Sequence, residues 1–213
     1  ALAAGARKVY GGARDPKSIT LPGVTPVALD VTQPAQAEAA ARACGDVTLL
    51  INNAGISRGS SFLGSPDAVA AARAELETNF FGPWALAQAF APVLAANGGG
   101  GMINVLSALS WTTFPSVATY SATKSAAWSL SNGLRNELAA QGTQVTSLHV
   151  GYMDTDMAAH AEGDKASPDD VARQALAGVE AGQPEVLADE VSRQLKQGLS
   201  SPTPPYAGSP QAA

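Results

Sequence analysis

The sequence predicts one α/β domain built around a parallel sheet, and three observations lead to this prediction. Strand-like stretches alternate with helical stretches of about 10 to 20 residues, as strand–helix–strand units require. The apolar run Val47–Ile51 is continuous, as expected for a strand that is buried on both faces. With 213 residues, 46% of them hydrophobic, the chain can also bury a substantial core.

Each element of the first half has a local signal. Pro34 opens an alanine-rich stretch, in the first turn of a helix, where its missing N–H is harmless. Gly82-Pro83 predicts a kink or a boundary inside a long helical region. The predicted elements are strands at Lys8–Ala13, Val24–Leu29 and Val47–Ile51, a helix at Pro34–Cys44, and a helical region capped by Ser65–Asp67 that reaches about Ala96.

The second half continues the alternation. Gly142 ends a long helix, and Ser167-Pro168-Asp169-Asp170 is a strong helix N-cap signature. Residues 1–199 are expected to form the single domain, and the proline-rich segment 200–213 a flexible tail. The predicted elements are strands at Met102–Leu106, Val145–Val150 and Pro184–Ala188, and helices at Thr119–Gln141, Ser167–Ala181 and Glu190–Leu199.

Composition excludes several classes of function. A net charge of −5 and a pI near 4.9 argue against a nucleic-acid-binding protein, whose surface would be basic. One cysteine, Cys44, allows no intramolecular disulfide, and with the two histidines, His149 and His160, it predicts no metal centre. Because no apolar run reaches about 18 residues and no secretory signal is visible, we expect a cytoplasmic protein with no membrane partner.

The chemistry should lie at one edge of the sheet. In doubly wound folds the ligand binds beyond the carboxyl ends of the strands, so the segments that follow the strands should converge. These segments are Ala13-Arg14, Asp30-Val31, Asn52-Asn53-Ala54-Gly55, Ser107 and Gly151-Tyr152-Met153.

Tyr120 and Lys124 are four residues apart in a predicted helix, so their side chains share one face. An ammonium beside a phenol stabilises the phenolate, and we therefore expect Lys124 to lower the pKa of Tyr120. This would make Tyr120 a proton donor or acceptor near neutral pH. The alternative is a chance spacing.

Further motifs strengthen the first interpretation. Four features, in their order along the chain, resemble the short-chain dehydrogenase/reductase family. They are Asn-Asn-Ala-Gly after a buried strand, Asn79 on the long helix, Ser107, and the Tyr120–Lys124 pair. The resemblance covers Val9 to about Met157. It implies a Rossmann-like, three-layer α/β/α fold, a nicotinamide coenzyme and a small carbonyl or alcohol substrate.

The resemblance assigns catalytic roles residue by residue. Tyr120 would be the general acid in carbonyl reduction and the base in alcohol oxidation, and Lys124 would bind the nicotinamide ribose. Ser107 would donate to the substrate oxygen, and its rival Ser110 fits the family spacing poorly. The backbone of Asn79 would hold a water that links Lys124 to a proton relay, although Asn79 can also be an ordinary residue of a helix kink.

The resemblance also assigns a coenzyme site. Asp30 would meet the adenine, although it can equally cap the helix that begins near Pro34. Val150 replaces the family's usual proline before Gly151. The implied cofactor-binding residues are Arg14, Asp30, Val31, Asn53, Ala54, Gly55, Tyr120, Lys124, Gly151, Met153 and Thr155.

Coenzyme choice depends on the end of the first predicted strand. Family members specific for NAD carry an acid there, but this chain has Ala13 followed by Arg14. A guanidinium at this place can pair with a 2′-phosphate, which favours NADP(H), with NAD(H) still possible. The alternative is that Arg14 pairs with Asp15.

Residues outside the motifs have weaker assignments. His149 is interpreted as a packed histidine and Cys44 as structural. Trp111, Phe114 and Tyr152 either line a substrate pocket or are ordinary aromatics of the core and rim. The segment from Ala158 to Ser167 occupies the family's substrate-loop position and is short, which predicts an open pocket.

Two functions remain. The first is an NADP(H)-dependent carbonyl reductase or alcohol dehydrogenase, which family resemblance predicts to be a homodimer or homotetramer paired through the long helices. The second is a catalytically silent or truncated family member that acts as a scaffold. The sequence lacks the family's first strand and glycine-rich turn, so we expect a missing segment of roughly 20–25 residues and two unpaired inner edges in the sheet.

Overall fold

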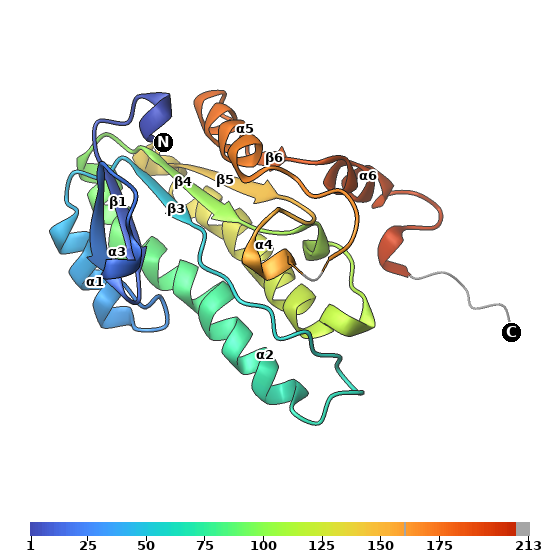
Figure 1. The fold of residues 1–213 in the computed structure, drawn as a ribbon. Coiled ribbons are helices and arrows are strands. Elements are labelled where there is room, and N and C mark those ends of the chain that lie inside the picture. Colours follow the sequence, from blue (N-terminus) through green and yellow to red (C-terminus); the bar gives the residue numbers. More distant parts are fainter. Residues whose placement is uncertain (160, 208–213) are drawn as a thin grey trace, which may run out of the picture.

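The structure, a computed structural model, describes residues 1–159 and 161–207. Its strands are all parallel and form two sheets, a two-stranded sheet β1–β2 and a four-stranded sheet in the order β3–β4–β5–β6 (Figure 1). The strands are β1 (Val9–Ala13), β2 (Val24–Ala28), β3 (Leu49–Asn52), β4 (Gly101–Val105), β5 (Gln144–His149) and β6 (Glu185–Leu187). The helices are α1 (Pro34–Ala43), α2 (Ala68–Leu76), α3 (Gly82–Ala96), α4 (Ala118–Glu137), α5 (Pro168–Glu180) and α6 (Glu190–Gly198).

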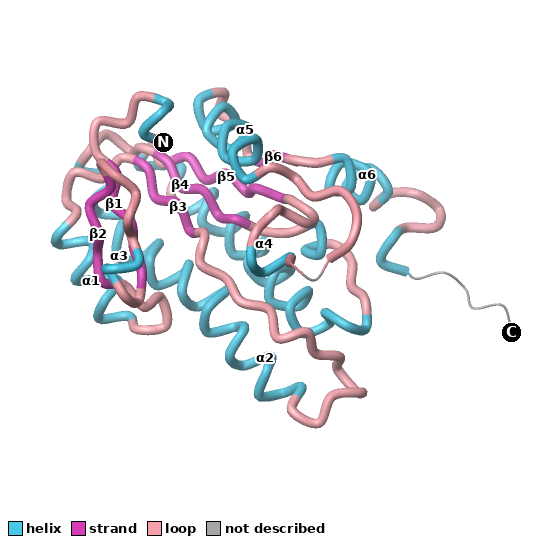
Figure 2. Tube along the Cα trace, in the orientation of Figure 1, coloured by secondary structure: helices cyan, strands magenta, loops and turns pink. Residues whose placement is uncertain are grey.

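Helices cover both faces of the larger sheet (Figure 2). On one face, Leu94 of α3 and Leu134 of α4 pack against Met102 and Val145. On the other face, residues of α5 pack against the opposite sides of β4 and β5. This arrangement confirms the predicted three-layer, Rossmann-like α/β fold, because parallel strands are buried by helices on both sides.

The long helical region of residues 68–96 contains a π-helical turn, Glu77–Phe81, between α2 and α3. A Cβ added at Gly82 would lie 2.9 Å from Val31 Cγ2, so only glycine lets α3 start this close to the chain after β2. The predicted kink is therefore present. The predicted cap is different: Asp67 makes no side-chain capping bond, and Ser65 Oγ accepts from Ser61 N–H.

The prediction that the third strand is buried on both faces is wrong. β3 pairs only with β4, and Ile51 is 44% exposed. A cavity of about 460 Å³ separates β3 from β1, and its lining includes Tyr10 and Leu50. The two facing edges are unpaired in the described structure, as the sequence predicts for a sheet without a central strand.

The described part of the predicted tail, residues 200–207, includes a 3₁₀ turn at Pro205–Ala207. Thr112 Oγ1 donates to the carbonyl oxygen of Pro205 at 3.3 Å, which holds this turn against the domain. The rest of the predicted tail, residues 208–213, lies outside the described residues, as does His160. Within the described ranges, no helix is long and apolar enough to cross a membrane.

Candidate active site

Ser107 follows β4 and caps a single 3₁₀ turn, Ala108–Ser110. Its Oγ accepts from Leu109 N–H at 3.1 Å, and its side chain approaches Tyr120 closely enough to lower the pKa of the phenol. Because a backbone N–H already donates to the oxygen, the hydroxyl proton of Ser107 is available for the Tyr120 oxygen. The rival Ser110 instead accepts from Ser107 N–H at 3.4 Å. The structure therefore pairs Ser107, and not Ser110, with the tyrosine.

Helix α4 presents Tyr120 and Lys124 on one face, as their spacing predicts. Lys124 Nζ lies 5.6 Å from the centroid of the Tyr120 ring. The ammonium donates to the carbonyl oxygen of Val105 at 2.9 Å. This bond ties α4 to the end of β4, two residues before Ser107, and so holds the helix and the strand end in register.

Asn79 lies in the π-helical turn and joins two neighbouring segments. Its Oδ1 accepts from Ile56 N–H at 2.9 Å, and its Nδ2 donates to the Ile56 carbonyl at 2.9 Å. Nδ2 also donates to Thr123 Oγ1 on α4 at 2.9 Å. A Cβ added at Gly55 would lie 3.4 Å from Asn79 Oδ1 and 3.7 Å from Lys124 Nζ. The structure confirms that Asn79 lies in the helix kink, and its role in holding a water stays a prediction.

Burial reverses one electrostatic expectation. It raises the pKa of Tyr120 to about 12, while the hydrogen bond from Ser107 opposes this rise and the charge of Glu75 adds to it. Burial also lowers the pKa of Lys124 to about 8. The predicted fall in the Tyr120 pKa is therefore wrong for this structure. The ammonium lies beside the ring and donates to a backbone carbonyl, and the burial of the phenol outweighs its effect on the Tyr120 pKa.

On the coenzyme side, the Asp30 carboxylate accepts from the N–H and the hydroxyl of Thr32, at 3.0 and 2.7 Å. These bonds hold the pKa of Asp30 below its usual value, and the charge of Arg14 contributes. Asp15 accepts from Lys17 N–H at 3.0 Å, and within the described chain no salt bridge joins it to Arg14. Helix α1 has Gln33 as its N-cap and no side-chain capping bond, so the structure supports neither the capping role of Asp30 nor the Arg14–Asp15 pair.

The segment after β5 is held by a residue that the sequence analysis missed. Gly151 N–H donates to Asp189 Oδ2 at 2.5 Å, and the same carboxylate caps α6 through Ser192 N–H. An aspartate directly before a helical stretch is the signal that indicates such a cap. Thr155 Oγ1 donates to the carbonyl oxygen of Met153 at 3.3 Å.

A second missed residue is Glu75, which is fully buried on α2. Its Oε1 accepts from Arg58 N–H at 2.6 Å, and its Oε2 has no hydrogen-bond partner in the structure. Glu75 precedes Asn79 by one turn, and both side chains hold the loop after β3. An acid on the inward face of an alanine-rich helix was the available signal.

The aromatic candidates separate into core and surface. Trp111 is buried and stacks on His149 at 4.0 Å between ring centroids, so His149 is packed as predicted. Phe114 and Tyr152 are exposed. Within the described ranges, no group of three His, Cys, Asp or Glu side chains could hold a metal ion.

The family follows from comparison with known proteins. The family model described as short chain dehydrogenase matches residues 15–166. The chain therefore belongs to the short-chain dehydrogenase family, which agrees with the resemblance and the fold.

Individual relatives match different shares of the chain. The chain is 34% identical over 117 residues to dehydrogenase/reductase SDR family member 7B of Xenopus laevis, covering 55% of this chain but only 36% of that protein. It therefore spans about a third of the length of this curated relative. A short chain dehydrogenase from Burkholderia cenocepacia, solved in complex with NADP, is 40% identical, with a TM-score of 0.90 over 94% of this chain and 85% of that one. A gluconate 5-dehydrogenase from the same organism, 24% identical, shares the fold with a TM-score of 0.76 over 87% of this chain and 85% of its own.

Proposed function

We propose that this chain transfers a hydride between NADP(H) and a carbonyl or alcohol substrate, with Tyr120 as the general acid or base. The observation that carries this proposal is the approach of the Ser107 side chain to the Tyr120 phenol, with Lys124 Nζ 5.6 Å from the centroid of the same ring. A hydroxyl and a phenol, with an ammonium beside the phenol ring, are the groups needed to protonate a developing alkoxide.

The chain's own groups have separate tasks in carbonyl reduction. The coenzyme, when bound, supplies the hydride. Because burial raises the pKa of Tyr120 to about 12, the phenol is protonated at neutral pH and gives its proton to the substrate oxygen. Ser107 donates a hydrogen bond to that oxygen as negative charge develops on it. Lys124 then stabilises the phenolate that Tyr120 leaves behind. In alcohol oxidation the proton moves the other way.

The described residues fit a nicotinamide coenzyme. Lys124 carries three N–H donors, and its hydrogen bond to Val105 uses one of them, so two remain for ribose hydroxyls. Gly55, where an added Cβ would meet Asn79 Oδ1 at 3.4 Å and Lys124 Nζ at 3.7 Å, lets the backbone approach a ligand closely. The further proposed contacts are Arg14, Asp30, Val31, Asn53, Ala54, Gly151, Met153 and Thr155.

Two observations favour NADP(H) over NAD(H). Arg14 is exposed at the end of β1, and its neighbour Asp15 caps Lys17 instead of pairing with it. The 40% identical dehydrogenase from Burkholderia cenocepacia was solved with NADP. A guanidinium that is available at this strand end suits the 2′-phosphate.

The test measures the oxidation of NADPH and NADH by the purified protein with a panel of ketones and aldehydes. We expect carbonyl-dependent turnover that is faster with NADPH and falls by about 10²- to 10⁴-fold in Tyr120→Phe, as for loss of a general acid. Turnover that is unchanged in Tyr120→Phe would refute the assigned acid. A clear preference for NADH would refute the coenzyme choice.

A second candidate, a catalytically silent binding subunit, is favoured by the split sheet. The cavity between β1 and β3 separates the strand that carries Arg14 from the strand that leads to Asn53. A chain that binds NADPH with no turnover on any carbonyl of the panel would support this candidate. Carbonyl-dependent turnover excludes it.

We also propose that copies of the chain pair through α2, α3 and α4 in the cytoplasm. Phe81 and Trp84 stack on the outer side of the long helix and are 45% and 40% exposed. Large aromatic side chains in one exposed patch are typical of protein interfaces. Light scattering should give twice or four times the chain mass, and Trp84→Glu should lower it.

A further inference from the structure

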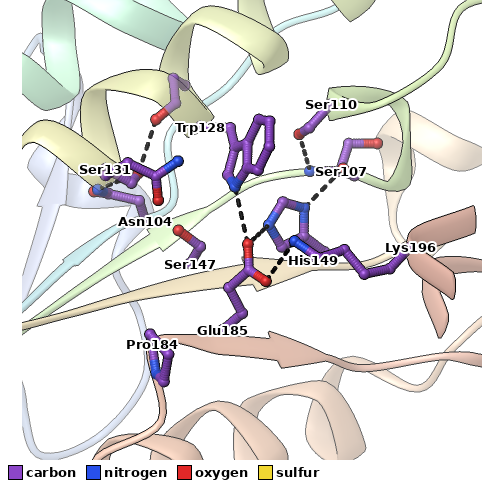
Figure 3. Close-up of polar contacts among 12 residues, drawn as sticks. Asn104, Ser107, Ser110, Trp128, Ser131, Ser147, His149, Pro184, Glu185 and Lys196 are labelled. Atoms are coloured by element: carbon purple, nitrogen blue, oxygen red, sulfur yellow. Dashed lines mark hydrogen bonds and ion pairs between the residues drawn. The ribbon is translucent and has the colours of Figure 1, made fainter. Parts of the chain in front are cut away.

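A cluster of aromatic and charged side chains lies directly behind Ser107 (Figure 3). His149 of β5 is its centre and is fully buried. Its Nδ1 lies 3.1 Å from the carbonyl oxygen of Ser107. The Trp111 ring stacks on the imidazole, and Trp128 of α4 packs edge-on against Trp111 at 6.1 Å. The ring of His149 is therefore fixed in position and orientation.

Glu185 of β6 connects this cluster to two helices. Its Oε1 accepts from Trp128 Nε1 at 2.9 Å, and its Oε2 pairs with Lys196 of α6 at 2.7 Å. The Lys196 ammonium lies about equally far from both tryptophan rings, at 5.0 and 5.1 Å. Trp128 stands one turn after Lys124, so the same helix carries Tyr120, Lys124 and this anchor.

The hydrogen bond defines the protonation of the imidazole. A backbone carbonyl only accepts, so the proton must be on Nδ1 of His149. Nε2 then carries a lone pair, lies 3.8 Å from Glu185 Oε1 and has no hydrogen-bond partner. The imidazole therefore serves as a donor to Ser107 and to nothing else in the described structure.

The backbone around Ser107 shows what this donor controls. Leu106 N–H and Ala108 N–H donate to the carbonyls of Leu148 and Val150, at 2.7 and 3.0 Å, on either side of His149. The Ser107 carbonyl accepts from Ser110 N–H and from the His149 ring. The imidazole is thus one of three groups that hold the peptide plane between Ser107 and Ala108, next to the hydroxyl that faces Tyr120.

We propose that His149 is a positioning residue of the reaction, whose Nδ1–H orients the Ser107 carbonyl and with it the Ser107 hydroxyl toward Tyr120. This inference rests on the proposed function, because it assigns a task within the same site. His149 itself does not contact the reacting atoms.

The surroundings keep the imidazole in the required state. Burial lowers the pKa of His149 to about 4; the carbonyl of Ser107 and the charge of Glu185 oppose this, and the charges of Lys196 and Lys124 add to it. These groups come from β4, β6, α6 and α4, the elements packed around the ring. At neutral pH the ring is neutral, so its donor stays on the side of Ser107.

Two amide variants separate the roles of the two ring nitrogens. Asparagine places an amide N–H near the position of Nδ1, whereas glutamine places it near Nε2. We expect His149→Asn to keep kcat near that of the wild type, and His149→Gln and His149→Leu to lower it by about tenfold, the equivalent of one hydrogen bond. The dissociation constant for NADPH should stay unchanged in all three. Because the Asn and Gln variants are both polar, their comparison remains valid if His149→Leu does not fold.

A second measurement does not depend on activity. The ¹⁵N shifts of the His149 ring in the wild-type protein should show a neutral imidazole protonated at Nδ1 from neutral pH down to about pH 5. Protonation at Nε2 would overturn the inference, and so would equal kcat values for His149→Asn and His149→Gln. A wild-type protein that reduces no carbonyl would instead overturn the proposed function.

Discussion

The two sheets of this molecule differ in how deeply their strands are buried. In β5 every residue after Gln144 is buried, and in β4 every residue before Val105. In β1 and β2 every residue is at least partly exposed. The four-stranded sheet carries Ser107 and is covered by the helix of Tyr120 and Lys124, whereas the two-stranded sheet carries Arg14.

This difference separates two demands on the site. Proton transfer needs groups held in one geometry, and close packing on both sides of β4 and β5 supplies it. Selection between coenzymes needs a charge that meets a phosphate, and an exposed guanidinium at a strand end is sufficient. Changes in the larger sheet should therefore alter rates, and changes in the smaller sheet should alter coenzyme affinity.

The largest expected effect comes from the larger sheet. Ser107→Ala should lower kcat for carbonyl reduction by about 10²- to 10³-fold, as for loss of one donor to a developing oxyanion. The matched control is Ser110→Ala, which removes the other hydroxyl of the same turn and should leave kcat within a few-fold. Steady-state kinetics with NADPH measure both. Equal losses in the two variants would mean that the geometry of the turn, and not the Ser107 hydroxyl, is responsible.

The second expected effect is on the free energy of unfolding, and it comes from His149 in the larger sheet. Burial lowers the pKa of His149 to about 4, whereas the unfolded chain titrates this group near 6.5. Between these values the unfolded state binds the additional proton, so stability is lost as pH falls from about 6.5 to about 4, by about 3 kcal/mol in total.

Urea unfolding at several pH values measures this loss, and His149→Asn, which cannot titrate, is the reference. The difference in the free energy of unfolding between the two proteins should change with pH in this window. A pH-independent difference would show that the imidazole titrates normally in the folded protein.

Much of this larger sheet could be predicted from the sequence, because its signals are local. The bounds of β5 and α5 follow from an apolar run and from the cap at Ser167. The order of the strands then brings Ser107 near Tyr120. The signs of the electrostatic effects could not be predicted in the same way. The pKa of Tyr120 depends on burial by segments distant in sequence, and the approach of Glu75 depends on how α2 packs on α4.

The exposure of β3 also could not be predicted from a local sequence pattern. The run Val47–Ile51 has the composition of a buried strand, yet burial depends on neighbours on both sides. β3 has a partner on one side and a cavity on the other. Asp189 shows the same limit, since its helix cap is local but its bond to Gly151 joins segments that are distant in sequence.

The third effect belongs to the smaller sheet. Arg14→Ala should raise the KM for NADPH by about ten- to a hundredfold, the range for a lost hydrogen bond to a charged group. The KM for NADH and kcat should hardly change. Lys17→Ala is the matched control, because it removes a nearby exposed cation whose side chain is outside the proposed site. An Arg14→Ala protein with unchanged selectivity would place the choice of coenzyme outside β1.

The smallest effect is a pH dependence that belongs to the larger sheet alone. Burial lowers the pKa of Lys124 to about 8, so the ammonium is charged below this pH and loses its charge above it. Since the charge stabilises the phenolate left after proton transfer, kcat/KM for the carbonyl substrate should fall above about pH 8 and approach a tenfold loss per pH unit.

Lys124→Arg keeps its charge throughout this range, and the activity that it retains should lack the falling limb. Arg14→Ala should keep the limb, because the smaller sheet contributes no titrating group to this step. A limb that is present in Lys124→Arg, or absent from Arg14→Ala, would show that the two regions do not act separately.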